Sequence, residues 1–350
     1  APFIKPINKK LFSPIFLKDF NLSKKVKKGR LYITGLGLYI AYINEQKVGN
    51  AYLTPGYNDY DYYLRYQTYD ISKLLQEENK IEVHMGDGWY KGRFGLLSIK
   101  KIYGSEYKLC LNLVVEYKDN SILNVLSDES WKIKSSKEVS NSIYDGETID
   151  YNLKEKPYGG VVISKENYNL IPDFGSLIVE HEILKPELII SPKDENILDF
   201  KQNMVGFIRF KGFLENNQKI KIKHGEILQK GCFYNENYRS AKEGALIFVG
   251  DGKERVYEPK FTFFGFRYVL IEGLKKVNPE EFEGVVIYTN LERVLECKTD
   301  NKKINQLIKN AYWSQRGNFL DVPTDCPQRD ERMGWTGDAQ VFLNTACYNM

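Results

Sequence analysis

The stretch Asp321–Asp338 reads DVPTDCPQRDERMGWTGD and is the most informative part of this 350-residue chain. It holds five carboxylates, two guanidinium groups and one indole, and its two prolines and two glycines oppose a regular helix or strand. Apolar residues with helical spacing lie on both sides of it. We therefore predict a functional loop held between two helices.

The helix before this loop is predicted from four apolar residues at i, i+3, i+4 and i+7, namely Ile304, Leu307, Ile308 and Ala311. Asp300 or Asn301 can cap its first turn, and the helix should end near Gly317. A second helix should begin near Asp338. Its apolar face would contain Val341, Phe342, Thr345 and Ala346. An all-helical domain is thus expected to begin near residue 296 and to be cut off at Met350.

Upstream of the helices, the chain consists of short segments rich in β-branched and aromatic residues, separated by Gly, Asn and Pro. The first set is Leu31–Thr34, Leu38–Ile43, Tyr62–Thr68, Lys80–Met85 and Ile122–Lys134. The second set is Ile197–Phe200, Met204–Phe210, Gln218–Ile227, Arg255–Phe264 and Tyr268–Glu272. We predict a mainly β fold with two antiparallel β-sandwich domains, at about 1–175 and 176–295, followed by the helical residues 296–350.

Composition argues against several classes of protein. The net charge of +4 comes from 50 basic and 46 acidic residues that are interspersed, which disfavours nucleic acid as a partner. The apolar run Gly35–Ile43 is too short to cross a membrane, and no leader precedes it. We expect a soluble cytoplasmic protein, and the sequence permits a homo-oligomer.

Metal sites and disulfides are not expected either. The five cysteines are odd in number and lack a CxxC spacing. The three histidines, His84, His181 and His224, lie far apart and are expected to be structural, with their hydrogen bonds satisfied. We predict neither a cofactor nor a metal. Trp89 could be a sugar platform but is expected to be a core or domain-packing residue. Tyr144–Glu147 could line the catalytic cleft or bind an ion, although turn chemistry alone explains its Asp-Gly pair.

The acids of the loop suit glycoside hydrolysis, in which one carboxylic acid protonates the departing oxygen and a second carboxylate acts on water or carbon. Neighbouring acids raise the pKa of a carboxyl group and arginines lower it, so the donor should be the acid shielded from Arg329 and Arg332. The residues alone do not say which acid that is. A solvated, salt-bridged loop or a divalent-metal site are the alternatives.

The core of this loop, DCPQRDERMGWTGDAQ at Asp325–Gln340, closely resembles the hallmark of the bacterial α-L-rhamnosidases of glycoside hydrolase family 78. Upstream, PGYNDY at Pro55–Tyr60 with GDGWY at Gly86–Tyr90 is similar to the family's N-terminal β-domain.

The second β-rich region is also similar to that family. Phe200–Phe207, HGE at His224–Glu226 and FFGFRY at Phe263–Tyr268 resemble its second, concanavalin-like β-domain. The resemblance covers nearly everything after the first 20 residues.

The resemblance implies an enzyme that releases terminal α-L-rhamnose from glycosides or oligosaccharides with inversion of configuration. Glu331 would be the general acid. Asp325, Arg329 and Asp338 would hold sugar hydroxyls, and Trp335 would lie against the sugar. Rhamnose carries a methyl group in place of the 6-hydroxyl, which suits an indole face.

The family's general base lies late in an (α/α)6 barrel, of which the helices here would be the first. We therefore expect a fragment that has the acid but not the base and that is inactive alone. The alternative function is a non-catalytic carbohydrate-binding protein that holds sugar on its β-sandwich domains.

Overall fold

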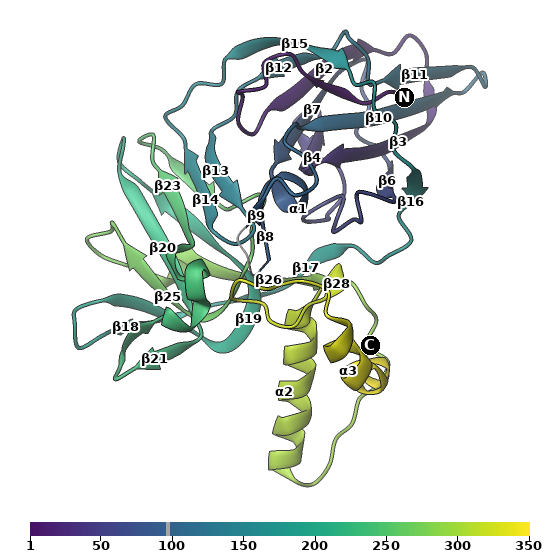
Figure 1. Cartoon of the computed structure of the whole chain (residues 1–350). Helices are drawn as coiled ribbons and strands as arrows, with labels where there is room; N and C mark the ends of the chain where they lie inside the picture. The colour runs from purple at the N-terminus through teal and green to yellow at the C-terminus, as the bar shows by residue number, and fades with distance from the viewer. Residues whose placement is uncertain (96–98) are drawn as a thin grey trace. The chain divides into compact units, whose positions relative to one another are not determined.

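The computed structural model describes residues 1–95 and 99–350 and shows a mainly β protein, as predicted (Figure 1). The chain forms two compact units. The first comprises Ala1–Arg93, Ile99–Ile143 and Glu147–Gly175. The second comprises Phe94, Gly95, Tyr144–Gly146 and Ser176–Met350. Across the described residues, no helix is both long and apolar enough to pass through a membrane. The division into three domains at 1–175, 176–295 and 296–350 stays a prediction.

Twelve described strands of the first unit form one sheet. Eleven of them follow the hydrogen-bonded path β16-β6-β3-β10-β1-β15-β12-β2-β7-β4-β5, and β11 pairs with β10. Their bounds are Ile4–Pro6 (β1), Ile15–Asn21 (β2), Val26–Leu36 (β3), Leu38–Ile43 (β4), Gln46–Lys47 (β5), Leu64–Asp70 (β6), Glu78–Gly86 (β7), Lys108–Tyr117 (β10), Ile122–Leu126 (β11), Lys132–Lys134 (β12), Pro157–Ile163 (β15) and Leu170–Pro172 (β16). The pair β16–β6 is parallel, in contrast to the purely antiparallel arrangement expected. The long connection between these two strands permits this pairing.

Strands from both halves of this path contribute to one hydrophobic core. Leu31 of β3 lies opposite Leu113 of β10, and Val83 of β7 lies opposite Phe16 of β2 on one side and Ala41 of β4 on the other. All five side chains are buried in the same cluster. The path therefore folds over on itself as a sandwich.

Short elements complete this part of the chain, namely α1 (Gly88–Lys91), β8 (Arg93–Phe94), β9 (Ile99–Lys100), β13 (Glu138–Ser142) and β14 (Gly146–Asp150). Trp89 in α1 is buried against Tyr57, with an edge-to-face distance of 5.8 Å between ring centroids. The prediction that Trp89 is a core residue is confirmed.

The second unit contains the path β23-β20-β25-β19-β26-β17, with β18 and β24 also paired to β19. The strand bounds are Ile178–Leu184 (β17), Glu187–Ile190 (β18), Asn196–Phe213 (β19), Lys219–Gly225 (β20), Ile227–Gln229 (β21), Cys232–Tyr234 (β22), Ala245–Val249 (β23), Glu254–Tyr257 (β24), Phe264–Glu272 (β25), Phe282–Thr289 (β26), Phe319–Leu320 (β27) and Val322–Pro323 (β28). The helices are the 3₁₀ segments η1 (Glu236–Glu243) and η2 (Pro279–Glu281) and the α-helices α2 (Lys302–Asn318) and α3 (Thr336–Asn349). Every residue of β26 is buried, and α2 packs on β19 and β26.

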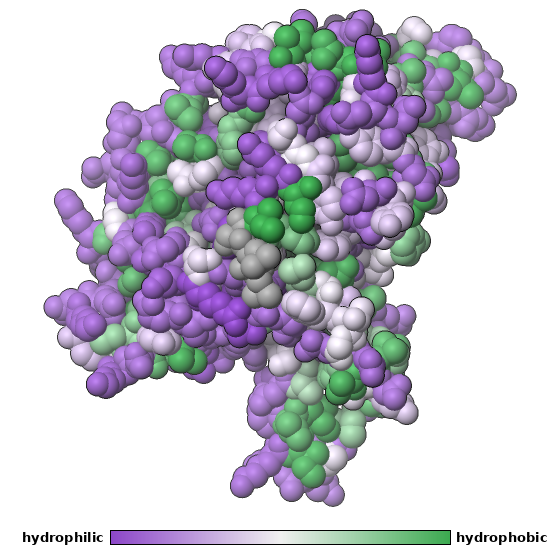
Figure 2. All heavy atoms as spheres, in the orientation of Figure 1, coloured by the Kyte–Doolittle hydropathy of each residue, from purple (hydrophilic) through white to green (hydrophobic). Residues whose placement is uncertain are grey.

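Both predicted helices are present. Asn301 caps α2, its side chain accepting hydrogen bonds from the backbone N–H groups of Lys303 and Ile304. The predicted apolar stripe of α2 is, however, largely uncovered, because Ile304 is 45% and Leu307 67% exposed. Apolar side chains are visible on the helical segment in Figure 2.

Candidate active site

The loop Asp321–Asp338 is fixed at its start to the ends of α2 and β26. The hairpin β27–β28 turns at Asp321, which has a φ of 69° and donates its backbone N–H to Thr289 Oγ1 at 2.7 Å. Thr324 donates its backbone N–H to Asn318 O, also at 2.7 Å. The end of β26 and the end of α2 therefore fix the position of the first turn of the loop.

The middle of the loop is fixed by two buried charged residues. Asp330 accepts hydrogen bonds from the backbone N–H of Ser240, at 2.8 Å, and from the Ser240 hydroxyl. Arg332 is 2% exposed and donates from Nη1 to Phe263 O at 2.9 Å. Buried charged groups are costly unless they are hydrogen-bonded in this way, so these contacts define one path for the loop.

Tyr144 also contacts the loop, from a distant part of the sequence within the same unit. Its hydroxyl donates to the backbone oxygen of Glu331 at 2.7 Å, and the Arg332 guanidinium lies 4.6 Å from the centre of its ring. The stretch Tyr144–Glu147 therefore supplies a residue that supports the proposed proton donor through its backbone.

Glu331, the predicted general acid, is mostly buried, with a side chain that is 13% exposed. Its Oε2 is ion-paired with Arg329 Nε, lies 3.9 Å from Arg239 Nη1, and accepts a hydrogen bond from the Cys326 thiol at 3.6 Å. The expectation that the donor is shielded from both arginines of the loop is therefore wrong for this residue. Arg332 is engaged elsewhere, but Arg329 contacts the carboxylate directly.

Asp325 shares the same guanidinium group, with Oδ2 3.8 Å from Arg329 Nη2. Burial raises the pKa of the Asp325 carboxyl, and the nearby charge of Glu331 raises it further. Burial likewise raises the pKa of the Cys326 thiol to about 12, and its hydrogen bond with Asp325 adds to the shift. The thiol therefore stays protonated near neutral pH and can donate to Glu331.

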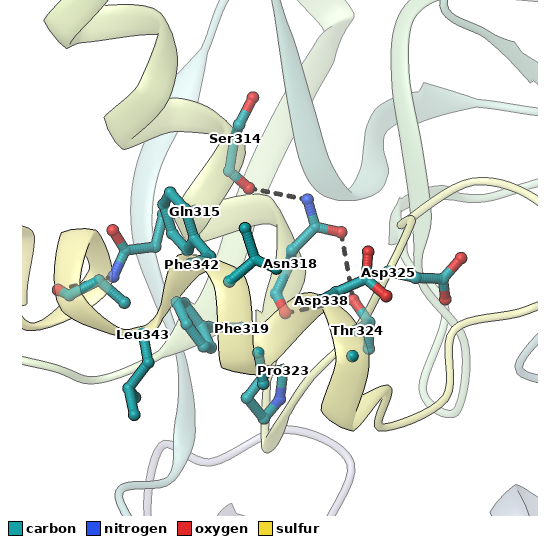
Figure 3. Close-up of a pocket in the computed structure, with 14 residues that line it drawn as sticks. Ser314, Gln315, Asn318, Phe319, Pro323, Thr324, Asp325, Asp338, Phe342 and Leu343 are labelled. Carbon is teal, nitrogen blue, oxygen red and sulfur yellow. Dashed lines mark hydrogen bonds between the residues drawn. The ribbon is translucent and has the colours of Figure 1, made fainter.

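Asp325 lies where two pockets meet. The first pocket, of about 510 Å³, is formed by α2, α3 and the loop, and Asp338, Phe342 and Leu343 line it together with Asp325 (Figure 3). The second, of about 410 Å³, lies among β19, α2 and the loop. Glu331 lines neither pocket, although its carboxylate contacts Cys326, which lines the second.

The five predicted site residues are therefore only partly gathered. Asp325, Arg329 and Glu331 form one ion-paired cluster. Asp338 joins Asp325 around the first pocket from the first turn of α3. Trp335 directly precedes α3 and is 38% exposed, so its indole is available to a ligand.

Asp325, Cys326 and Glu331 each offer a ligand atom, and these atoms lie within 4.8 Å of one another. Such a set could hold a metal ion. The guanidinium groups of Arg329 and Arg239 already approach the same carboxylates, and their positive charge opposes a cation there. The arrangement suits hydrogen bonding to a polar ligand better.

Two residues outside the predicted set, Arg239 and Glu226, also contribute to this region. Arg239, in η1, reaches Glu331 from a backbone with a φ of 57°, a conformation that side-chain-bearing residues rarely adopt. Glu226 lines the second pocket. The HGE motif drew attention to the segment that contains Glu226, but the sequence holds no signal that would have identified Arg239.

Comparison with known proteins shows three family matches along the chain. They are the α-L-rhamnosidase N-terminal domain at residues 24–172, the bacterial α-L-rhamnosidase concanavalin-like domain at 190–288, and the bacterial α-L-rhamnosidase 6 hairpin glycosidase domain at 292–350. An α-L-rhamnosidase of Formosa agariphila is 36% identical over 95% of the chain and 38% of its own length. One of Streptomyces avermitilis is 34% identical over 93% of the chain and 33% of its own length.

Solved structures agree with these matches. The native α-L-rhamnosidase of Aspergillus terreus superposes with a TM-score of 0.95 at 35% identity, over all of this chain and 43% of that one. The S. avermitilis α-L-rhamnosidase complexed with L-rhamnose superposes with a TM-score of 0.92 at 34% identity, over 97% of this chain and 34% of that one. The chain thus spans between 33% and 43% of the length of these relatives.

Proposed function

The chain belongs to the bacterial α-L-rhamnosidase family, and on that premise we propose that it forms part of an enzyme that releases terminal α-L-rhamnose from glycosides. The observation that carries the proposal is the convergence of Asp325, Arg329 and Glu331 beside two pockets. A buried acid, a second carboxyl group and a guanidinium group supply both a proton and hydrogen bonds to sugar hydroxyls. A non-catalytic sugar-binding protein is not favoured, because the similar proteins are named α-L-rhamnosidases.

In the proposed reaction, Glu331 protonates the departing oxygen in a single inverting displacement. The Cys326 thiol and Tyr144 hold the Glu331 side chain and backbone, respectively. When a sugar binds, Arg329 hydrogen-bonds to its hydroxyl groups. Asp325 and Asp338 bind further hydroxyls, and Trp335 packs on the apolar side of the ring.

The general base would lie in further helices of an (α/α)6 barrel that begins with α2 and α3. The exposed apolar residues of both helices support this proposal, since Leu307 is 67% and Val341 85% exposed. Large apolar side chains exposed on neighbouring helices are available to pack against further elements. The 350-residue chain alone would then lack hydrolytic activity. The cytoplasmic location and the homo-oligomer stay predictions.

The substitution Glu331→Gln tests the assigned role, in a polypeptide that carries these residues and a complete helical domain. We expect kcat to fall by roughly 10² to 10⁴ on a rhamnosyl disaccharide, because a general acid contributes about that much. The loss should be much smaller on an aryl α-L-rhamnoside with a good leaving group, which needs little protonation.

The matched control is Glu292→Gln, which removes an exposed carboxylate upstream of α2 and should leave both rates unchanged. Equal turnover by Glu331→Gln and the unsubstituted protein on the disaccharide would show that another group donates the proton.

A further inference from the structure

A break in the register of β19 forms one wall of the second pocket. The pairing of β19 with β25 shifts between Asp199 and Met204, and Lys201 within the break has a φ of 61°. Such bulges turn side chains out of the regular alternation and are common beside binding sites. Here Gln202 and Asn203 line the pocket.

Glu226 forms the next part of this wall, directly after β20. Its carboxylate accepts a hydrogen bond from Asn203 Nδ2 at 3.0 Å, and the Gln328 side chain of the loop is a second hydrogen-bonding neighbour. Burial raises the pKa of the Glu226 carboxyl group. The strand bulge and the loop therefore hold one acid between two amide groups.

The loop side of the pocket presents acceptors without donors. Asp325 Oδ1 and Gln328 Oε1 are buried, and within the described part of the chain neither accepts a hydrogen bond. A buried acceptor that has lost water costs free energy until a donor reaches it. Hydroxyl groups of a ligand would supply such donors.

The pocket also contains an aromatic residue and has room for a sugar. Trp313 of α2 lines it, and the Arg316 guanidinium lies 4.0 Å from the centre of the Trp313 ring, holding the indole in place. A volume of about 410 Å³ falls within the usual range for small-ligand sites. An indole with amides and carboxyls around it matches the mixed surface of a hexose.

The charge of the lining is one-sided. Among the described residues that line the pocket, Glu226 and Asp325 are acidic and none is Lys or Arg, while the Arg329 guanidinium lies outside the lining, beside Asp325 and near Glu226. A ligand that carried its own carboxylate would meet like charge in a partly desolvated site.

We propose that this pocket binds the group attached to rhamnose and selects a neutral, hydroxylated group, such as a second hexose, over a uronic acid. The inference rests on the proposed rhamnosidase function and adds a specificity determinant, Glu226, to it. Asp325 borders both pockets, so a rhamnosyl unit on one side of it and its leaving group on the other would share that residue.

The test compares kcat/KM for three substrates at neutral pH, again in a polypeptide with a complete helical domain. They are α-L-rhamnosyl-glucose, α-L-rhamnosyl-glucuronic acid and an aryl α-L-rhamnoside without hydroxyls on its ring. We expect Glu226→Gln to lower the preference for the neutral over the acidic disaccharide by about tenfold, since one charge is removed. Asn203→Ala should lower kcat/KM for the neutral disaccharide more than for the acidic one. Urea unfolding like that of the unsubstituted protein reports that both variants fold.

The control is Glu254→Gln, which removes an exposed acid of the same unit outside the pocket and should leave all three values unchanged. An unaltered preference in a folded Glu226→Gln that still hydrolyses the disaccharides overturns the inference and leaves the proposed function standing. If the unsubstituted protein hydrolyses none of the three substrates, both the proposed function and this inference are overturned.

Discussion

His224 lies beside the loop as a fully buried residue whose ring is packed on an aromatic neighbour. It is 1% exposed and stacks on Phe264 with 3.8 Å between ring centroids. Within the described residues, neither ring nitrogen has a hydrogen-bond partner. Burial lowers the pKa of His224 to about 3, and the charge of Arg332 lowers it further. The histidine is buried in the core as expected, but it is not the hydrogen-bonded histidine that was predicted, and its ring is kept neutral.

This neutral state makes stability depend on pH. Between the pKa of about 3 in the folded chain and about 6.5 in the unfolded chain, only the unfolded chain takes up the proton. The free energy of unfolding should therefore fall as pH drops below about 6.5. The substitution His224→Phe keeps the stacking and removes the titrating group. The free energy of unfolding of this variant should therefore fall less steeply with decreasing pH, and the two slopes should differ by at most about 1.4 kcal/mol per pH unit.

Urea unfolding at pH 5, 6 and 7 measures the difference between the two proteins. Above pH 7 the two stability curves should run parallel. Parallel curves down to pH 5 as well would show that His224 titrates normally in the folded chain.

At the scale of the element, α2 positions the start of the loop, and its first turn depends on one side chain. Asn301 Oδ1 accepts from the backbone N–H of Lys303 at 2.9 Å and of Ile304 at 3.4 Å. Asn301→Ala leaves these donors without a partner and should lower the free energy of unfolding by about 1 kcal/mol. Asn301→Asp keeps the acceptor and should cost little. Chemical unfolding of the three proteins tests this, and equal losses in both variants would contradict the capping role.

The helices and several strands could be predicted because their signals are local. The apolar spacing and cap of α2 lie within a few residues of one another, and the run Leu38–Ile43 coincides with β4. Loop residues close in sequence, such as Asp325 and Glu331, could likewise be placed together.

Contacts between distant segments could not be predicted in this way. Arg239 reaches Glu331, and Asn203 reaches Glu226, only because the sheet brings their strands and loops together. Local sequence also could not decide which of Arg329 and Arg332 contacts the Glu331 carboxylate, since both lie within two residues of Glu331. That choice depends on Phe263 O, which accepts from Arg332.

At the scale of the whole chain, α2 and α3 leave several large apolar side chains exposed. In α3, Val341 is 85% and Leu343 58% exposed, and both border the first pocket. Only Ala346 of the predicted α3 face is fully buried, next to Gln315 of α2, which donates to its backbone oxygen at 3.1 Å. Periodicity thus identified the apolar face but not the element that covers it.

The double substitution Val341→Ala, Leu343→Ala should therefore have opposite effects in two contexts. In the 350-residue chain it removes exposed apolar surface, so the binding of a hydrophobic dye and self-association should decrease while the free energy of unfolding stays within about 0.5 kcal/mol. In a polypeptide with a complete helical domain, the same side chains would be covered by neighbouring helices. Their truncation should then cost roughly 2 to 5 kcal/mol, as for other buried leucines. Dye fluorescence, sedimentation and urea unfolding of both pairs measure these effects, and a neutral result in the longer polypeptide would mean that no helix packs on this face of α3.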